Sequence, residues 1–204
     1  MLIFIEGQDA TGKDTQAEML KNYFESKGES VVHYSESGTA SPDPFISAIA
    51  NLNYQKDFGI DKKTRVLLYL VNRYEQWKRF AEPALKAGKT VIITRSWFST
   101  LVYEGYGTGV SRSFIAHIHK KLLPPSYFHP DKYVIFTLPD EERQKRLIAQ
   151  GKRSEEFFKS KDAEFQARLN RAYIEIGKKY EVPTLDASGT PEEVFERLKK
   201  LFQI

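Results

Sequence analysis

The sequence of 204 residues contains no cysteine. Disulfides, thiolate chemistry and cysteine-ligated zinc or iron–sulfur sites are therefore excluded. The sequence also lacks an apolar run of about 18 residues, the length that a membrane span requires. Its opening apolar stretch meets Glu6 too early for the core of a signal peptide. We therefore expect a soluble, unsecreted protein that works in the cytoplasm.

An excess of charge of one sign is also nearly absent. The 31 Lys and Arg residues against 27 Asp and Glu residues give a formal net charge of +4. Lysine pairs are scattered along the chain and interleaved with acidic residues, which is typical of solvated helix faces rather than of a nucleic-acid surface. We expect no nucleic-acid partner. A chain of 204 residues is long enough for one domain with its own hydrophobic core and short for two such domains. We therefore expect a single domain over residues 1–204.

Hydrophobic patterning predicts strands that alternate with helices. Apolar or β-branched runs bounded by turn residues predict strands at 2–5, 31–34, 90–94, 133–138 and 182–185. Helical patterns occur at 13–27, 62–80, 82–87, 96–103, 111–122, 140–150, 162–179 and 191–202. Strands joined by helices run mostly parallel, because the crossover connection is right-handed. We predict an α/β fold: a doubly wound, five-stranded parallel sheet flanked by helices.

A glycine-rich segment follows the first predicted strand and opens the first predicted helix. It consists of Gly7, Gln8, Asp9, Ala10, Thr11, Gly12 and Lys13. Glycines let backbone N–H groups converge on a phosphate, the helix N-terminus adds partial positive charge, and Lys13 supplies a point charge. A turn that needs glycine only for steric reasons is the alternative. Because the segment joins a strand to a helix, it indicates polyphosphate binding.

The longer string from Phe4 to Gln16 resembles the opening of the thymidylate kinases, a family of P-loop nucleoside monophosphate kinases. Three later stretches agree with this family in order: residues 67–73, 95–105 and 185–188. The likeness thus covers nearly the whole chain. It implies transfer of the γ-phosphate of ATP to dTMP, giving dTDP and ADP, with Mg²⁺ as cofactor and a homodimer as the assembly. The residues that it implies for ATP are Gly7 to Lys13, Asp14 and Thr15.

The resemblance also implies a set of residues around the monophosphate. Asp9 would hold its 3′-hydroxyl, Tyr69 would stack on the pyrimidine ring and Arg73 would contact a base oxygen. Thr100 and Tyr103 would line the base and the 2′ edge of the sugar. A tyrosine suits stacking, because it offers a flat apolar face with little entropy to lose. Taken singly, Tyr69 is as compatible with core packing, and Arg73 with a surface position.

Three basic residues are implied to be catalytic. Lys13 contacts the donor phosphates, and Arg95 grips the acceptor phosphate with its planar fork. Members of the family with Gly or Ala at the position of Ala10 bring a further basic residue from a mobile lid. The charged segment 151–161 is the predicted lid, and Arg153 is the predicted lid arginine, with the preceding lysine as the alternative.

Three positions depart from the family pattern. Asp14 stands where a Ser or Thr hydroxyl usually ligates Mg²⁺, Thr94 stands where the strand usually ends in Asp, and Ser35 replaces an arginine. We hypothesise that the first two changes compensate, with Asp14 as the metal ligand. The alternative is that Asp14 only favours the helix dipole. The changes also leave open a kinase of another nucleoside monophosphate, such as dUMP or a modified nucleotide, or a nucleotide-binding homologue without turnover.

Overall fold

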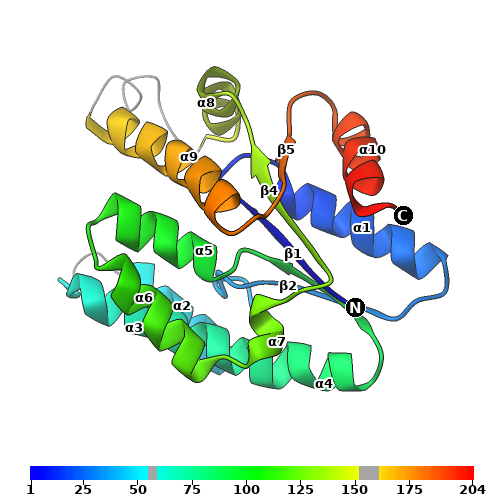
Figure 1. Ribbon diagram of the computed structural model, residues 1–204, viewed down its shortest axis with the longest axis horizontal. Coiled ribbons are helices and arrows are strands. Elements are labelled where there is room, and N and C mark those ends of the chain that lie inside the picture. The colour runs from blue at the N-terminus through cyan, green and yellow to red at the C-terminus, as the bar shows by residue number, and fades with distance from the viewer. Residues whose placement is uncertain (55–58, 152–160) are drawn as a thin grey trace.

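Five strands form one sheet in the computed structural model, which describes residues 1–54, 59–151 and 161–204 (Figure 1). The strands are β1 (Leu2–Gly7), β2 (Val31–Ser35), β3 (Thr90–Thr94), β4 (Lys132–Thr137) and β5 (Thr184–Asp186). Their order is β2-β3-β1-β4-β5, and each neighbouring pair is parallel. The predicted α/β fold with a five-stranded parallel sheet is confirmed.

Helices connect the strands, as the sequence pattern predicts. In chain order they are α1 (Lys13–Ser26), α2 (Pro44–Tyr54), α3 (Lys62–Gln76), α4 (Glu82–Lys86), α5 (Trp97–Thr100), α6 (Arg112–Leu122), α7 (Pro125–Phe128), α8 (Asp140–Ala149), α9 (Lys161–Lys179) and α10 (Pro191–Phe202). Two π-helical segments, η2 (Trp77–Ala81) and η3 (Leu101–Gly107), continue α3 and α5. Within the described residues, none of the helices combines the length and the apolar character of a membrane span.

The structure adds two helices that the sequence did not predict, α2 and α7, and it shifts the last strand. Before α2, the Asp43 carboxylate accepts hydrogen bonds from two N–H groups of the first turn at 3.0 and 3.2 Å, so a proline-rich stretch becomes a capped helix. The last strand begins at Thr184 because Val182 N–H bonds to the Gly177 carbonyl oxygen at 2.9 Å and Pro183 has no N–H.

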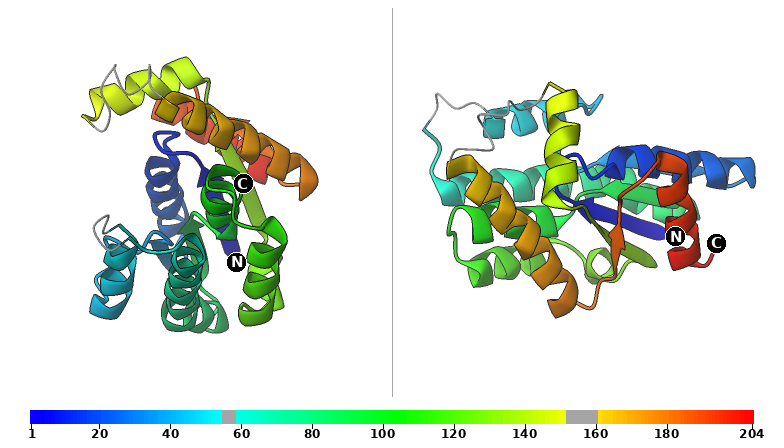
Figure 2. Two further views of the ribbon diagram at one scale, coloured as in Figure 1. Left: turned by 90° about the vertical axis from the view of Figure 1, so that its left-hand side faces the viewer. Right: turned by 90° about the horizontal axis from the view of Figure 1, so that it is seen from above.

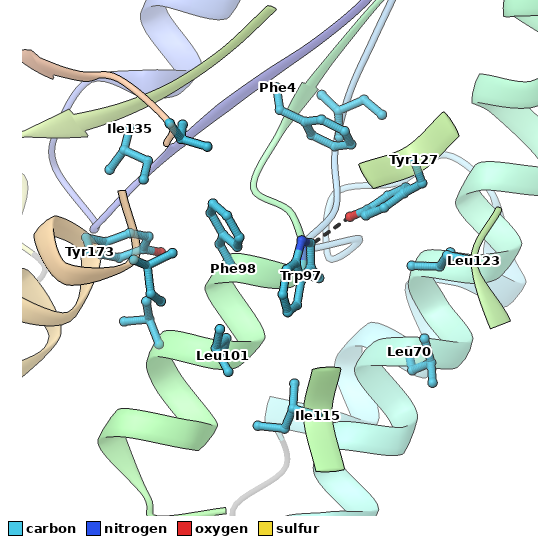
Figure 3. Packing of buried hydrophobic residues seen from close by; sticks show 14 of the residues in the cluster. Phe4, Leu70, Trp97, Phe98, Leu101, Ile115, Leu123, Tyr127, Ile135 and Tyr173 are labelled. Atoms are coloured by element: carbon cyan, nitrogen blue, oxygen red, sulfur yellow. Dashed lines mark hydrogen bonds between the residues drawn. The ribbon is translucent and has the colours of Figure 1, made fainter. Parts of the chain in front are cut away.

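The sheet separates two hydrophobic layers, because successive strand residues point to opposite faces. Ile3 and Ile5 of β1 pack with α1 and α10 on one face. Phe4 packs on the other face with residues of α3, α5, α6, α9 and both π-helical segments. Figure 3 shows the aromatic centre of this second layer, where the Trp97 N–H donates to the Tyr127 hydroxyl at 3.1 Å. This layer anchors the segment that follows β3.

The carboxyl ends of the parallel strands lie at one edge of the sheet, where β1 leads into α1 (Figures 1 and 2). α8 follows β4 at this same edge. α9 lies beside it, and Arg143 of α8 donates to Gln166 of α9 at 3.3 Å. Ligands of doubly wound sheets bind at this edge, so it is the place to examine for chemistry.

Candidate active site

The segment between β1 and α1, residues 7–13, forms a tight loop that we call the phosphate loop. At Gly7 (φ 143°) a Cβ would lie 2.7 Å from a carbonyl oxygen of β4, so the position requires glycine. Ala10 (φ 67°) and Gly12 (φ 82°) also have left-handed backbone conformations. Within residues 1–54, 59–151 and 161–204, no side chain caps the start of α1. Its first-turn N–H groups are therefore available to an anion.

Lys13 is buried under the phosphate loop, with 3% of its surface exposed. Its Nζ lies 3.9 Å from Asp9 Oδ1 and donates to the Gln8 carbonyl oxygen at 3.4 Å. Burial and the Arg95 guanidinium lower the pKa of Lys13 to about 8, while the Asp9 carboxylate opposes this shift. At neutral pH the ammonium is therefore charged, and a bound phosphate would stabilise that charge.

A cavity of about 280 Å³, which we call the donor cavity, opens beside the phosphate loop. Its lining residues are Ala10, Thr11, Gly12, Thr15, Gln16, Arg146, Gln150, Ala187, Gly189, Pro191 and Val194. Four of the residues predicted to bind ATP are among them. Ala187 belongs to the loop after β5, which the resemblance places beside an adenine. The cavity thus joins the phosphate loop to the predicted adenine loop.

Arg146 of α8 lines the donor cavity, and the sequence analysis missed it. Its Nη2 donates to the carbonyl oxygens of Ala187 (3.0 Å) and Gly189 (3.3 Å), and it pairs with Glu142 at 2.5 Å. These bonds fasten α8 to the loop after β5. In the sequence Arg146 is one charged residue on a charged helix, so no local signal distinguishes it from a solvated arginine.

A second cavity of about 240 Å³, the acceptor cavity, also borders the phosphate loop. Its lining residues are Asp9, Glu36, Ser37, Tyr69, Arg73, Arg95, Ser99, Thr100 and Tyr103. All six side chains predicted to contact the monophosphate are among them, although they come from separate segments of the chain. Asp9 lines this cavity and its neighbour Ala10 lines the donor cavity, so the phosphate loop lies between the two.

Arg95 follows β3 and faces the phosphate loop. Its φ of 67° is uncommon for a residue other than glycine, and such strain is typical of functional sites. Its Nη2 pairs with Asp9, its Nη1 donates to Ser99 Oγ at 3.4 Å, and the guanidinium carbon lies 5.9 Å from the Tyr103 ring centroid. Burial alone would lower the pKa of Arg95, but the Asp9 carboxylate holds this pKa well above its usual value. The guanidinium is thus a fixed cation at the boundary of the two cavities.

Glu6, at the end of β1, holds the segment that carries Arg95. Its buried carboxylate accepts hydrogen bonds from the N–H groups of Ser96 (2.6 Å) and Ser99 (2.9 Å), from both of their hydroxyls (2.8 and 3.0 Å) and from the Tyr173 hydroxyl (3.2 Å). Glu6 is not among the site residues predicted from the sequence. The signal was present, since an acidic residue inside an apolar strand needs buried donors.

Arg73 of α3 and Glu36, after β2, form a buried ion pair at the acceptor cavity. Arg73 Nε pairs with Glu36, its Nη1 donates to Thr100 Oγ1 at 3.1 Å, and its Nη2 donates to the Ser96 carbonyl oxygen at 2.8 Å. The Tyr127 hydroxyl bonds to both carboxylate oxygens of Glu36 at 2.9 and 3.0 Å. Burial raises the pKa of Glu36 to about 7, although Arg73 opposes this shift. Arg73 is therefore held rigidly before any ligand binds.

His119 contacts Arg73 and is not among the residues that line the cavity. Its Nε2 lies 2.8 Å from Arg73 Nη1, and its Nδ1 lies 2.7 Å from the Ile115 carbonyl oxygen. Because arginine can only donate, Nε2 accepts and Nδ1 carries the proton. Burial and the charge of Arg73 lower the pKa of His119 to about 3. The imidazole is therefore neutral, and it orients the arginine without adding charge.

Tyr69, Thr100 and Tyr103 complete the wall of the acceptor cavity. The Tyr103 hydroxyl is buried and has no hydrogen-bond partner within the described residues, and burial raises its pKa. A buried hydroxyl of this kind is suited to a polar group of a ligand. Ser35, where the resembled family has arginine, does not line this cavity, and its Oγ lies 3.1 Å from that of Ser37.

Asp14 and Thr94, which the sequence analysis linked through Mg²⁺, have opposite environments. Thr94 is fully buried and its hydroxyl has no partner in the part of the chain described, whereas Asp14 is exposed on the first turn of α1. Its neighbour Thr15 lines the donor cavity. Residues 1–54, 59–151 and 161–204 contain no cluster of three His, Asp or Glu side chains that could hold a metal alone. The predicted lid arginine, Arg153, lies outside these residues.

Comparisons with known proteins agree with this geometry. The family model described as thymidylate kinase matches residues 5–198. The thymidylate kinase of Mesoplasma florum is 33% identical over 206 residues, covering 98% of this chain and 94% of the relative. That of Caldicellulosiruptor saccharolyticus is 30% identical over 200 residues, with coverage of 98% and 94%. The crystal structure of thymidylate kinase from Ehrlichia chaffeensis shares the fold, with a TM-score of 0.77, 24% identity and coverage of 100% and 98%. This chain belongs to the thymidylate kinase family.

Proposed function

We propose that this chain transfers the γ-phosphate of ATP to dTMP, giving ADP and dTDP. The observation that carries the proposal is the acceptor cavity. Its wall contains all six side chains that the family resemblance assigns to the monophosphate. A pocket that gathers these residues beside a phosphate loop is what transfer between two bound nucleotides requires.

Phosphoryl transfer depends on position and charge, because the protein contributes little covalent chemistry. The phosphate loop and Lys13 bind the donor phosphates, and Arg95 binds the acceptor phosphate. Asp9 pairs with both cations and so fixes them on the path between the cavities. An oxygen of the acceptor phosphate attacks the γ-phosphorus of ATP, the bond to the β–γ bridging oxygen breaks, and ADP departs.

The start of α1 offers oxygen ligands that fit Mg²⁺, which prefers hard oxygen donors. The Asp14 carboxylate is exposed there, and Thr15 lines the donor cavity. We propose that Asp14 holds the ion together with phosphate oxygens of the donor. Mg²⁺ bound in this way would neutralise negative charge on the donor phosphates.

The predicted lid 151–161 remains part of the proposal. Ala10 leaves the phosphate loop without an arginine of its own, so a basic residue from the lid would complete the charge around the transferring group. We expect Arg153→Ala to lower kcat far more than it raises the KM for dTMP. If Arg153→Ala left both kcat and the KM for dTMP unchanged, Arg153 would have no role in the mechanism.

A homodimer is the proposed assembly. α3 exposes Leu67 (45%) and Val71 (42%) one turn apart, and α2 exposes Phe45 and Leu52. An exposed apolar face of this kind is typical of a surface that a partner covers. Sedimentation equilibrium should give twice the mass of the chain, and Leu67→Glu with Val71→Lys should give the monomer.

A coupled assay of ADP formation tests the activity. ATP, Mg²⁺ and one nucleoside monophosphate at a time are supplied, with dTMP, dUMP, dCMP and dGMP compared. We expect dTMP to give the highest kcat/KM. A clear preference for dUMP, motivated by Ser35 and Thr94, would identify a kinase of another monophosphate. Binding of ATP and dTMP without ADP formation would identify a nucleotide-binding protein without turnover.

A further inference from the structure

Arg143 of α8 is a buried arginine that the mechanism above does not use. Its side chain is 1% exposed. Its Nη1 donates to Gln166 Oε1 at 3.3 Å, and its Nη2 lies 3.7 Å from Asp140 Oδ1. Its Nε is buried and has no hydrogen-bond partner among the described residues. Within the described part of the chain, Nη1 therefore makes a hydrogen bond, Nη2 faces a carboxylate at 3.7 Å, and the Nε–H group lacks an acceptor.

Such a cation is unfavourable in the free protein. A buried charge is tolerated when a close carboxylate and further hydrogen bonds compensate it, as Glu36 does for Arg73. Asp140 compensates Arg143 poorly, because its side chain is 38% exposed and it also accepts from Asn170 Nδ2 at 3.2 Å. Burial accordingly lowers the pKa of Arg143, although Asp140 opposes this shift. Among the described residues, Asp140 is the one carboxylate that pairs with Arg143, so the positive charge of Arg143 is only partly compensated.

The location of Arg143 indicates which anion would complete this compensation. Gln166 Oε1, its acceptor, also accepts from Gln8 Nε2 of the phosphate loop at 2.8 Å. The same Gln8 Nε2 donates to the Gln166 carbonyl oxygen at 3.0 Å. Arg143 is thus separated from the phosphate loop by one side chain. Asp9 and Tyr103, which line the acceptor cavity, are near enough to act on its charge. Figures 1 and 2 show α8 at the carboxyl edge of the sheet, next to this loop.

We propose that Arg143 is a positioning residue for phosphoryl transfer: its buried charge, together with its bond to Gln166, holds the phosphate loop ready for a polyphosphate. The anion is the phosphate chain of the donor nucleotide. In a buried setting the charge acts on that chain with little screening by water. The proposal rests on the proposed function, and it adds a fixed cation to a loop in which Ala10 supplies none.

A purely structural role makes the opposite prediction for the free protein. If Arg143 only joined α8 to α9, its removal would destabilise the fold. If its charge is uncompensated, Arg143→Met removes an unfavourable charge. The substitution leaves neither acceptor of Arg143 without a hydrogen bond, because Gln166 Oε1 still accepts from Gln8 and Asp140 still accepts from Asn170. The two roles therefore predict changes of opposite sign in the stability of the free protein when Arg143 is replaced.

The test compares Arg143→Met and Arg143→Gln with Arg143→Lys. Arg171→Met, which removes an exposed arginine of α9, is the matched control. Thermal unfolding without nucleotide gives the stability, and calorimetry without an acceptor gives the affinities for AMP, ADP and ATP. We expect the midpoints of the Met and Gln variants to be unchanged or raised. We expect their loss of affinity to grow with phosphate number, reaching about ten- to a hundredfold for ATP. The Lys variant should recover part of it.

A lower unfolding midpoint with an equal loss for all three nucleotides would overturn the proposal, and so would unchanged affinities. The same conclusion would follow if Arg171→Met behaved like Arg143→Met. Because no acceptor is present, these results do not depend on the identity of the monophosphate. Failure of the wild-type chain to phosphorylate dTMP would reject the proposed function and leave the proposal on Arg143 to its own test.

Discussion

The two cavities beside the phosphate loop are built in different ways. In the acceptor cavity, Arg73 and Arg95 are each paired with a carboxylate, and each donates a further hydrogen bond to a hydroxyl group, that of Thr100 or Ser99. The donor cavity is lined by small residues of the phosphate loop and of the loop after β5, together with residues of α1, α8 and α10, and its Arg146 is bonded to carbonyl oxygens. Side chains held in place can select a base, whereas a helix N-terminus recognises phosphate whatever is attached to it.

This difference assigns selectivity and chemistry to different parts of the site. The identity of the monophosphate should depend on the acceptor cavity, where rigid aromatic and guanidinium groups face the ligand. The donor side should tolerate changes of the base more readily, because its recognition rests on backbone N–H groups and Lys13. Substitutions in one cavity should therefore leave the KM of the other substrate nearly unchanged.

Arg95→Met should give the largest loss. It removes the forked cation at the boundary of the cavities, and we expect kcat/KM for dTMP to fall about 10²- to 10³-fold. Steady-state kinetics measure this, with the exposed Arg79→Met as the matched control. A loss below about threefold would contradict the assignment of the acceptor phosphate to Arg95.

Tyr69→Ala tests selection of the base. Loss of one stacked ring costs about 1–3 kcal/mol, so the KM for dTMP should rise about tenfold or more while the KM for ATP is unchanged. Tyr69→Phe keeps the ring and should resemble the wild type. If the KM for dTMP rises as much in the Phe variant as in the Ala variant, the hydroxyl rather than the ring face of Tyr69 makes the contact.

The pKa of Lys13, lowered to about 8, predicts a pH dependence on the donor side. The charged form binds phosphate, and that form is lost in the free protein above pH 8. ATP affinity should thus fall about tenfold per pH unit beyond this value. A bound phosphate raises the pKa again, so ATP binding at pH 8.5 should take up protons. Calorimetry in buffers of different ionisation enthalpy measures the uptake, and its absence would contradict the prediction.

The smallest expected effects concern the metal. Asp14→Ser and Thr94→Asp should each lower turnover a few-fold, and the double variant should exceed Asp14→Ser if the two positions compensate. The Mg²⁺ concentration for half-maximal activity is the second readout. A double variant no better than Asp14→Ser alone would show that Asp14 and Thr94 are independent.

The sheet and the phosphate loop could be predicted because each has a local signal, whereas the acceptor residues were predicted only from the family resemblance, since Tyr69 and Arg73 taken singly carry no distinctive signal. Buried parallel strands are continuous apolar runs, and the Gly7-to-Lys13 spacing carries its own chemistry. Glu36, Arg143 and Arg146 have no such signal. Their roles arise only when segments distant in the chain, such as α3 and the loop after β2, meet and exclude water. An arginine on a charged helix looks the same in sequence whether it is solvated or buried.

The two cavities meet at the phosphate loop, and this claim is tested most directly by a bisubstrate analogue in which thymidine and adenosine are joined through their 5′-oxygens by five phosphates. Calorimetry would compare its Kd with those of ATP and dTMP alone. If one ligand fills both cavities across residues 7–13, it should bind about 10²- to 10⁴-fold more tightly than either nucleotide, by effective concentration. A Kd no lower than that of ATP would contradict the account.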